Sequence, residues 1–467
     1  MKVTQFAKSF RFKLLLISKL TLMNTLSLSV DSRTLRRELM IRNLVVSAGL
    51  GMAMLLTMSS CKSDDDQPLP ELKSATYTSS SLALTYEGEA MPGKSVEVSY
   101  EKSAESGGSR MATLRMYSEF DLSQLTGTGL SGKVAGPGVL PGSPIEELEV
   151  TMIPGEGCYT FSGTASTDYV DYRYSGNLRS GLLTLNLTEC ALKTQTFAGM
   201  TFSPAPIEKD GLLDYTSLPF HLVWEIDPAS GVDIPLSDIL KGIVVAPVIP
   251  VYNNTAYTSI AEMMCSGIKT LNLTGSGNIP VVYVSTVGGA AHLATTCGNM
   301  LQYVPQAGGM KLYVNPLSAL SEILVALSKP SSDAEFVTKA GESSADGSLI
   351  SGLDPKVKAA FIQALAVTFA PQLSEGIPLS LTPTQNGVDI YFDTKTSVTF
   401  LSTILENMLK NPEIVQALQT YLSELKLPGM SQEEMAGILQ NLPGFLEKTT
   451  RLEVGLSLVK YTPAATN

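Results

Sequence analysis

The chain has few of the residue types on which many catalytic and metal sites depend. Its 467 residues include two histidines, one tryptophan and five cysteines. Zinc sites and hydrolytic triads built on histidine need further ligands or partners. His221 and His292 each stand alone in apolar, strand-like surroundings, so we interpret both as hydrogen-bonded structural residues. The sequence has no G-x-S-x-G, Walker, EF-hand or C-x-x-C motif, and we predict no catalytic, cofactor-binding or metal-binding residues.

One glycine motif resembles a dinucleotide fingerprint. Gly127, Gly129 and Gly132 in GTGLSG match G-x-G-x-x-G. That fingerprint needs a helix directly after it, whose N-terminus binds the pyrophosphate. The residues that follow read GKVAGPGVLPG, which cannot form a helix. We interpret this region as a flexible loop without a nucleotide.

Positive charge is scarce beyond the first sixty residues. Residues 1–60 hold nine Lys and Arg against two Asp and Glu, which leaves 24 against 42 in residues 61–467. The net charge of this larger part is −18. Such a surface repels phosphate backbones and anionic headgroups, so we expect no nucleic-acid partner and no polybasic membrane patch.

A short apolar run ends at a cysteine. Residues Leu44–Met58 are uncharged, and their length suits a secretory signal better than a membrane-spanning helix. The small residues before Cys61 resemble the lipobox of bacterial lipoproteins, which implies cleavage before Cys61 and lipid on its thiol. We therefore predict a signal region over 1–60 with Met40 as the natural start. A genuine N-terminal extension is the alternative.

A lysine and three aspartates follow this cysteine closely. Lys62, Asp64, Asp65 and Asp66 begin a polar segment, 61–74, that cannot bury enough apolar surface to fold and so acts as a tether. The cluster resembles the export signal that sends Bacteroidetes lipoproteins to the outer face of the outer membrane. The resemblance implies a lipid-anchored protein that faces the cell exterior; a periplasm-facing lipoprotein is the alternative.

Four cysteines remain after Cys61, and an exported chain permits disulfides. They are Cys158, Cys190, Cys265 and Cys297. Three pairings are possible and all four could be buried thiols. Cys158 and Cys190 are the pair that we consider for a disulfide in the first domain.

The first of two predicted domains, 75–227, has strand periodicity. Apolar residues alternate with polar ones, and Pro-Gly pairs separate the runs. This pattern predicts an antiparallel β-barrel-like or sandwich domain with one buried face per strand. The side chains expected to face inward, around a solid core or a cavity, are Leu82, Leu84, Val96, Val98 and Val150.

The second predicted domain, 228–467, is α+β. Asn315-Pro316, Asp354-Pro355 and Asn411-Pro412 each place an N-cap side chain before proline at the first helical position. Ser431 and Glu434 form a capping box that opens a fourth helix, which Pro443-Gly444 should end. Strands are expected at Val281–Val284, Val388–Phe392 and Leu452–Val459.

The segment LALTYEGEAMPGKSVEVSY (Leu82–Tyr100), with the later YTFSG and LTLNL, is similar to a family of Bacteroidetes outer-membrane lipoproteins with a domain of unknown function and lipocalin-like β-folds. The resemblance covers mainly the first domain and contains no catalytic motif. It implies the fold and says little about function. We expect a surface lipoprotein with a non-catalytic ligand-binding or structural role, because lipocalin-like barrels can enclose small molecules. Its partner is expected to be a small apolar molecule, a glycan or an envelope protein. The alternative is a glycan-binding or glycan-processing accessory of a polysaccharide uptake system. The single tryptophan, Trp224, speaks against sugar platforms, although tyrosines can replace it.

Overall fold

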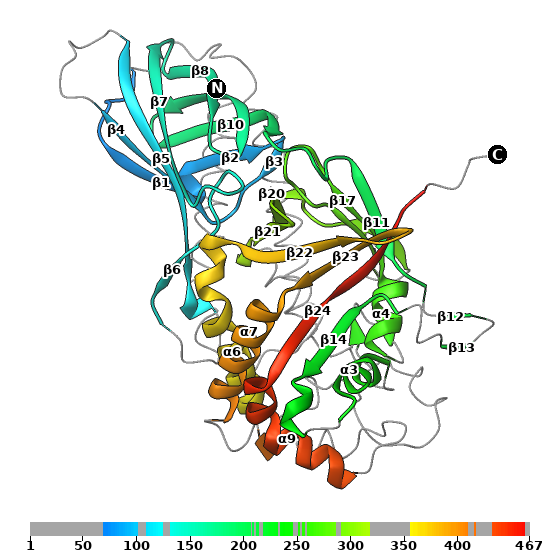
Figure 1. Cartoon of the computed structure of the whole chain (residues 1–467). Helices are drawn as coiled ribbons and strands as arrows, with labels where there is room; N and C mark the ends of the chain where they lie inside the picture. Colours follow the sequence, from blue (N-terminus) through cyan, green and yellow to red (C-terminus); the bar gives the residue numbers. More distant parts are fainter. Residues whose placement is uncertain are drawn as a thin grey trace. The chain divides into compact units, whose positions relative to one another are not determined.

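Strands form most of the regular structure of this chain, which confirms the predicted β-rich fold (Figure 1). The structure is a computed structural model. It describes residues 69–100, 109–124, 131–206, 208–209, 212–213, 218–231, 234–245, 251–252, 255–256, 259–285, 291–317, 355–409, 415–416 and 432–462. These residues build two curled, predominantly antiparallel sheets that form half-barrels.

The first sheet has the order β1-β4-β5-β7-β8-β9-β10-β2-β3, with β6 beside β5. Three residues, Ser79–Ser81, join β1 to β2 although these strands lie near opposite ends of the sheet, so the sheet must curl. Between β7 and β8 only two residue pairs are in register, Ile153 with Thr160 and Pro154 with Tyr159. The strands are β1 (Ala75–Thr78), β2 (Leu82–Tyr86), β3 (Glu89–Ala90), β4 (Lys94–Tyr100), β5 (Arg110–Asp121), β6 (Lys133–Ala135), β7 (Ile145–Pro154), β8 (Tyr159–Ser166), β9 (Val170–Arg179) and β10 (Leu182–Leu192).

Large apolar side chains fill the inner face of this sheet. The five residues predicted to face inward are all buried, which confirms the prediction that alternate residues of each strand face the core. Leu114, Met116 and Met152 are at most 1% exposed and belong to the same packed cluster. The described interior is therefore a packed core.

The loop that follows β6 lies inside the molecule. Residues 136–141 are buried, and Val139 and Leu140 join the core cluster. The expectation of a flexible loop here was wrong. Burying the apolar side chains of Val139 and Leu140 lowers the free energy relative to leaving the loop in water. Gly138 permits the tight turn, since a Cβ on it would lie 1.6 Å from the carbonyl oxygen of Ser143. Gly127 and Gly129 lie outside the described residues.

The second sheet has the order β19-β18-β17-β11-β24-β23-β22-β21-β20, with β14 also beside β24. Its curl brings the turn before β18 to β20, where Asn278 and Gln302 form an isolated bridge. Strands β11 and β14 lie within 75–227 in the sequence but pair in this sheet. Its strands are β11 (Met200–Pro204), β14 (His221–Ile226), β17 (Ile268–Leu273), β18 (Val281–Ser285), β19 (His292–Thr295), β20 (Leu301–Gln306), β21 (Gly309–Val314), β22 (Ile377–Pro383), β23 (Gly387–Phe392) and β24 (Thr449–Lys460).

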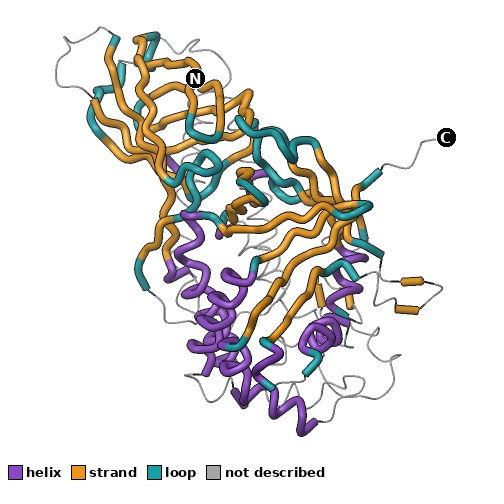
Figure 2. The backbone as a smooth tube through the Cα atoms, viewed as in Figure 1, coloured by secondary structure: helices purple, strands orange, loops and turns teal. Residues whose placement is uncertain are grey.

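Helices cover one face of the second sheet (Figure 2). Trp224 of β14 and Leu452 of β24 pack on this face against residues of α3, α7 and α9, including Phe445. The helices are α3 (Leu236–Val245), α4 (Ile260–Gly267), α6 (Pro355–Glu375), α7 (Thr394–Leu409) and α9 (Gln432–Glu447). Two short hairpins, β12 (Glu208–Lys209) with β13 (Leu212–Leu213) and β15 (Val251–Tyr252) with β16 (Thr255–Ala256), complete the described strands.

The helix predictions had different outcomes. Helix α6 begins at Pro355 as predicted, and the Asn315 side chain accepts a hydrogen bond from the Leu317 amide at 3.2 Å. Pro443 does not end α9, which continues to Glu447. The last turn buries Phe445 and Leu446 in the core, which offsets the hydrogen bond that proline removes. Asn411, Pro412 and Ser431 lie outside the described residues.

Candidate functional site

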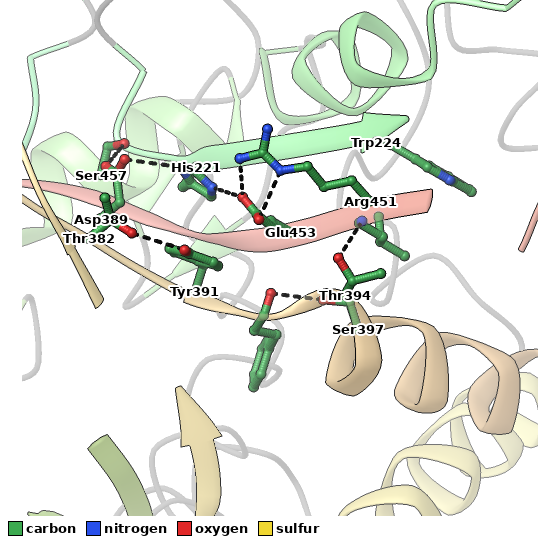
Figure 3. A network of polar contacts seen from close by, with 12 residues as sticks. His221, Trp224, Thr382, Asp389, Tyr391, Thr394, Ser397, Arg451, Glu453 and Ser457 are labelled. Carbon is green, nitrogen blue, oxygen red and sulfur yellow. Dashed lines mark hydrogen bonds and ion pairs between the residues drawn. The ribbon is translucent and has the colours of Figure 1, made fainter. Parts of the chain in front are cut away.

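A polar network lies on the face of the second sheet opposite the helices (Figure 3). His221 of β14 and Tyr391 of β23 are both in register with Gly455 of β24, one on each side of it. Residues two strands apart are separated by roughly 10 Å at the backbone, yet the two rings stack with centroids 4.3 Å apart. They can lean together because Gly455 has no side chain between them.

Both ring nitrogens of His221 face carboxylates. Nδ1 lies 3.1 Å from Asp389 Oδ2, and Nε2 lies 2.7 Å from Glu453 Oε2. A neutral imidazole has one N–H and satisfies one of these oxygens, whereas an imidazolium donates to both. Carboxylates therefore hold the imidazole ring on both sides.

Each carboxylate has a second partner. Ser457 Oγ donates to Asp389 Oδ1 at 2.6 Å. Arg451 donates to both oxygens of Glu453, with Nε at 2.9 Å from Oε1 and Nη2 at 2.8 Å from Oε2. Burial by itself raises the pKa of Glu453, but the hydrogen bonds from Arg451 and His221 outweigh it and lower that pKa. The pKa of Arg451 is raised, chiefly by its hydrogen bond to Glu453.

The order of contacts is serine, aspartate, histidine, glutamate and arginine. A serine nucleophile must hand its proton to histidine, whereas Ser457 donates to Asp389. The ring nitrogens of His221 are both occupied by carboxylates, and the side chains of His221, Asp389 and Glu453 are only 13–17% exposed. The network therefore has the geometry of a scaffold, not of a triad.

The rim of the network is exposed. Arg451 is 45% exposed and its Nη1 lies 3.5 Å from Oε1 of Glu225, which is 56% exposed. On the other side, the hydroxyls of Tyr391 and Thr382 are 2.9 Å apart. The rim therefore offers a cation, a carboxylate, a phenol and a hydroxyl on adjacent strands.

Other residues singled out from the sequence lie elsewhere. His292 is on β19 with an exposed side chain. Cys61, Lys62, Asp64, Asp65 and Asp66 lie outside the described residues. Of these residues only His292 is described, and it is not part of the network.

The structure corrects the disulfide considered between Cys158 and Cys190, because Cys190 is a free, buried thiol. Cys158 directly precedes Tyr159, which is in register with Leu178 and, through it, with Leu183. Cys190 lies seven positions farther along β10, roughly 23 Å at ~3.3 Å per residue. A disulfide needs Cα atoms about 4.4–6.8 Å apart.

Sequence reasoning found His221 but missed its partners. The prediction of a hydrogen-bonded structural histidine agrees with its two contacts, but Asp389 and Glu453 are 168 and 232 positions away. A weak signal existed, since D-x-Y in β23 and R-x-E-x-G-x-S in β24 place polar residues on alternate positions of apolar strands.

No group of three or more His, Cys, Asp or Glu residues in the described part of the chain could hold a metal ion. None of the helices that the structure describes combines the length and hydropathy of a membrane-spanning segment. No family model, curated protein or solved structure matches this chain.

Proposed function

We propose that this protein is a lipoprotein of the outer membrane, anchored by lipid on Cys61 and facing the cell exterior, with a non-catalytic recognition or structural role. The sequence from Met58 to Asp66 supports the anchor and the export signal. We propose that its N-terminal β domain, barrel-like or a sandwich, is followed by an α+β domain that contains the recognition surface.

One observation supports a non-catalytic role above all others. The polar network around His221 is closed: His221, Asp389 and Glu453 have their ring nitrogens and carboxylate oxygens engaged by one another, by Ser457 or by Arg451. A general base or nucleophile needs an atom directed at a substrate. A closed network of hydrogen bonds supplies rigidity instead.

The packed interior of the first sheet argues against an apolar ligand enclosed by that sheet. Leu114, Met116 and Met152 occupy the space that such a ligand would need. The recognition surface that we propose is the exposed rim on the second sheet, made of Glu225, Arg451, Tyr391 and Thr382. The charged and hydroxyl groups of this rim suit a polar surface of an envelope protein.

A glycan is the second candidate, and the stacked His221–Tyr391 pair favours it. Sugar sites combine an aromatic ring with fixed hydrogen-bonding groups, and Tyr391 lies beside the Thr382 hydroxyl and the Asp389 carboxylate. Glycan binding would still leave the closed network intact and non-catalytic.

Binding by matched variants tests the surface. The full-length protein, its Glu225→Gln/Thr382→Val variant and a Glu147→Gln control on the first sheet are presented to a glycan array and to solubilised envelope proteins. We expect the rim variant to lose at least about tenfold in affinity, the equivalent of ~1.4 kcal/mol, and the control to bind normally. Equal binding by all three proteins would exclude the rim as the recognition surface.

A further inference from the structure

A lysine is buried at the start of β4. Lys94 is only 4% exposed. Its Nζ donates a hydrogen bond to the carbonyl oxygen of Pro137 at 2.5 Å. Among the described residues no carboxylate forms an ion pair with it. An ammonium has three donors, and here one acceptor is present, so the charged form is poorly accommodated.

The elements packed around Lys94 bring no titratable side chain toward it within the described residues. Across from it on β5 is Ser118, whose hydroxyl donates to the Gly93 carbonyl at 3.1 Å. The buried loop 136–141 reads GPGVLP, and the Pro92-Gly93 turn meets Asn315 and Leu317. The nearest acid on β5, Glu119, is exposed and pairs with Lys133 at 3.0 Å. Burial alone lowers the pKa of Lys94 to about 7.

Among the described residues, backbone hydrogen bonds hold the loop over Lys94 near its two ends. The Gly136 amide donates to the Ser118 carbonyl at 2.8 Å, and the Ser143 amide to the Leu140 carbonyl at 3.1 Å. Between them lie Val139 and Leu140, which are 0% and 1% exposed. The contact of Lys94 with Pro137 therefore lies at the entry to a buried apolar loop.

We propose that docking of the loop 136–143 is coupled to a proton: the loop closes over the neutral amine of Lys94, and opening lets that amine take up a proton in water. In the open state the amine has the ordinary lysine pKa of 10.5, against about 7 in the closed state. Between these values the open state binds more protons. Closure is therefore favoured as pH rises from about 7 toward 10.5, and its pH dependence levels off below 7.

Hydrogen exchange on the full-length protein tests this coupling. Exchange of Gly136 and Ser143 is followed from about pH 6 to pH 9.5 and corrected for the intrinsic rate at each pH. We expect the opening constant of the loop to fall toward tenfold per pH unit above about 7 and to be flat below. In Lys94→Met the dependence should vanish, while peptides from β9 and β10 report no change in either protein.

Two outcomes overturn the proposal. One is an opening constant that is independent of pH in the wild type, and the other is the same slope in Lys94→Met. Should that variant fail to fold, the Cε resonance of Lys94 is titrated by NMR in the wild type. A midpoint near pH 7 supports the coupling, and a midpoint above about 9, close to that of a solvated lysine, excludes it.

Discussion

Replacing Glu453 with glutamine should break the polar network at its centre. The wild-type carboxylate accepts hydrogen bonds from His221 Nε2 at 2.7 Å and from two nitrogens of Arg451 at 2.8 and 2.9 Å. Glutamine keeps the size but has one acceptor oxygen, and its amide hydrogens would face donors. The variant therefore leaves the guanidinium of Arg451 without its carboxylate partner.

The expected loss follows from burial. Hydrogen bonds to charged groups contribute about 1.5–3 kcal/mol, and breaking a fully buried ion pair costs about 3–5 kcal/mol. Glu453 is 13% exposed but Arg451 is 45% exposed, so water replaces part of what Arg451 loses. We expect Glu453→Gln to lower the free energy of unfolding by roughly 2–3 kcal/mol, measured by urea denaturation near pH 7.

The matched control is Glu147→Gln on β7. Glu147 is 66% exposed, with Oε1 3.9 Å from Arg115 Nε, and an exposed pair of this kind contributes about 0–1 kcal/mol. We expect a loss below ~0.5 kcal/mol for the control. A loss for Glu453→Gln no larger than that of the control would refute the reasoning.

The acid side of the stability curve gives a second readout of the same variant. The pKa of Glu453 is lowered from its unfolded value of 4.5. Its contribution is therefore complete above pH 4.5 and is lost as pH falls through the lower folded pKa. Glu453→Gln should be destabilised near neutral pH and should lose less further stability than the wild type in this acid window.

Three further predictions concern other parts of the chain. Gly455→Ala should cost at least about 3 kcal/mol or prevent folding, because a Cβ there would lie 2.1 Å from the Ile390 carbonyl oxygen; normal urea denaturation of this variant would contradict the stacked geometry. Cys61→Ser should release the protein from the membrane fraction, and a mature protein that retains Leu44–Met58 would argue against lipidation. Replacing Lys62, Asp64, Asp65 and Asp66 with alanine should keep the lipid but reduce protease shaving on intact cells, whereas equal shaving would reject the export signal.

Local patterns in the sequence were sufficient for many elements of the fold. Alternating apolar residues located strands such as β4 and β7, because each has one buried face. Pro355 marked the start of α6 through its position at the first helical residue. A similar signal at α4 was overlooked, since Ser259 caps that helix by accepting a hydrogen bond from the Glu262 amide.

Tertiary contacts decided what local patterns could not. The GPGVLP loop has turn composition, and only the packing of Val139 and Leu140 in the core shows that it is buried. The burial of Phe445 carries α9 past Pro443. The site is the extreme case, because three strands distant in the sequence bring His221, Asp389 and Glu453 together.

Product analysis tests the central claim of a non-catalytic recognition protein most directly. The full-length protein is incubated with solubilised envelope proteins and with glycans from its host, and mass spectrometry records both bound and released species. We predict that ligand is retained by the rim of Glu225, Arg451, Tyr391 and Thr382 and that no new product forms. Steady turnover that disappears in His221→Gln and Asp389→Asn variants, while both remain folded, would contradict the account.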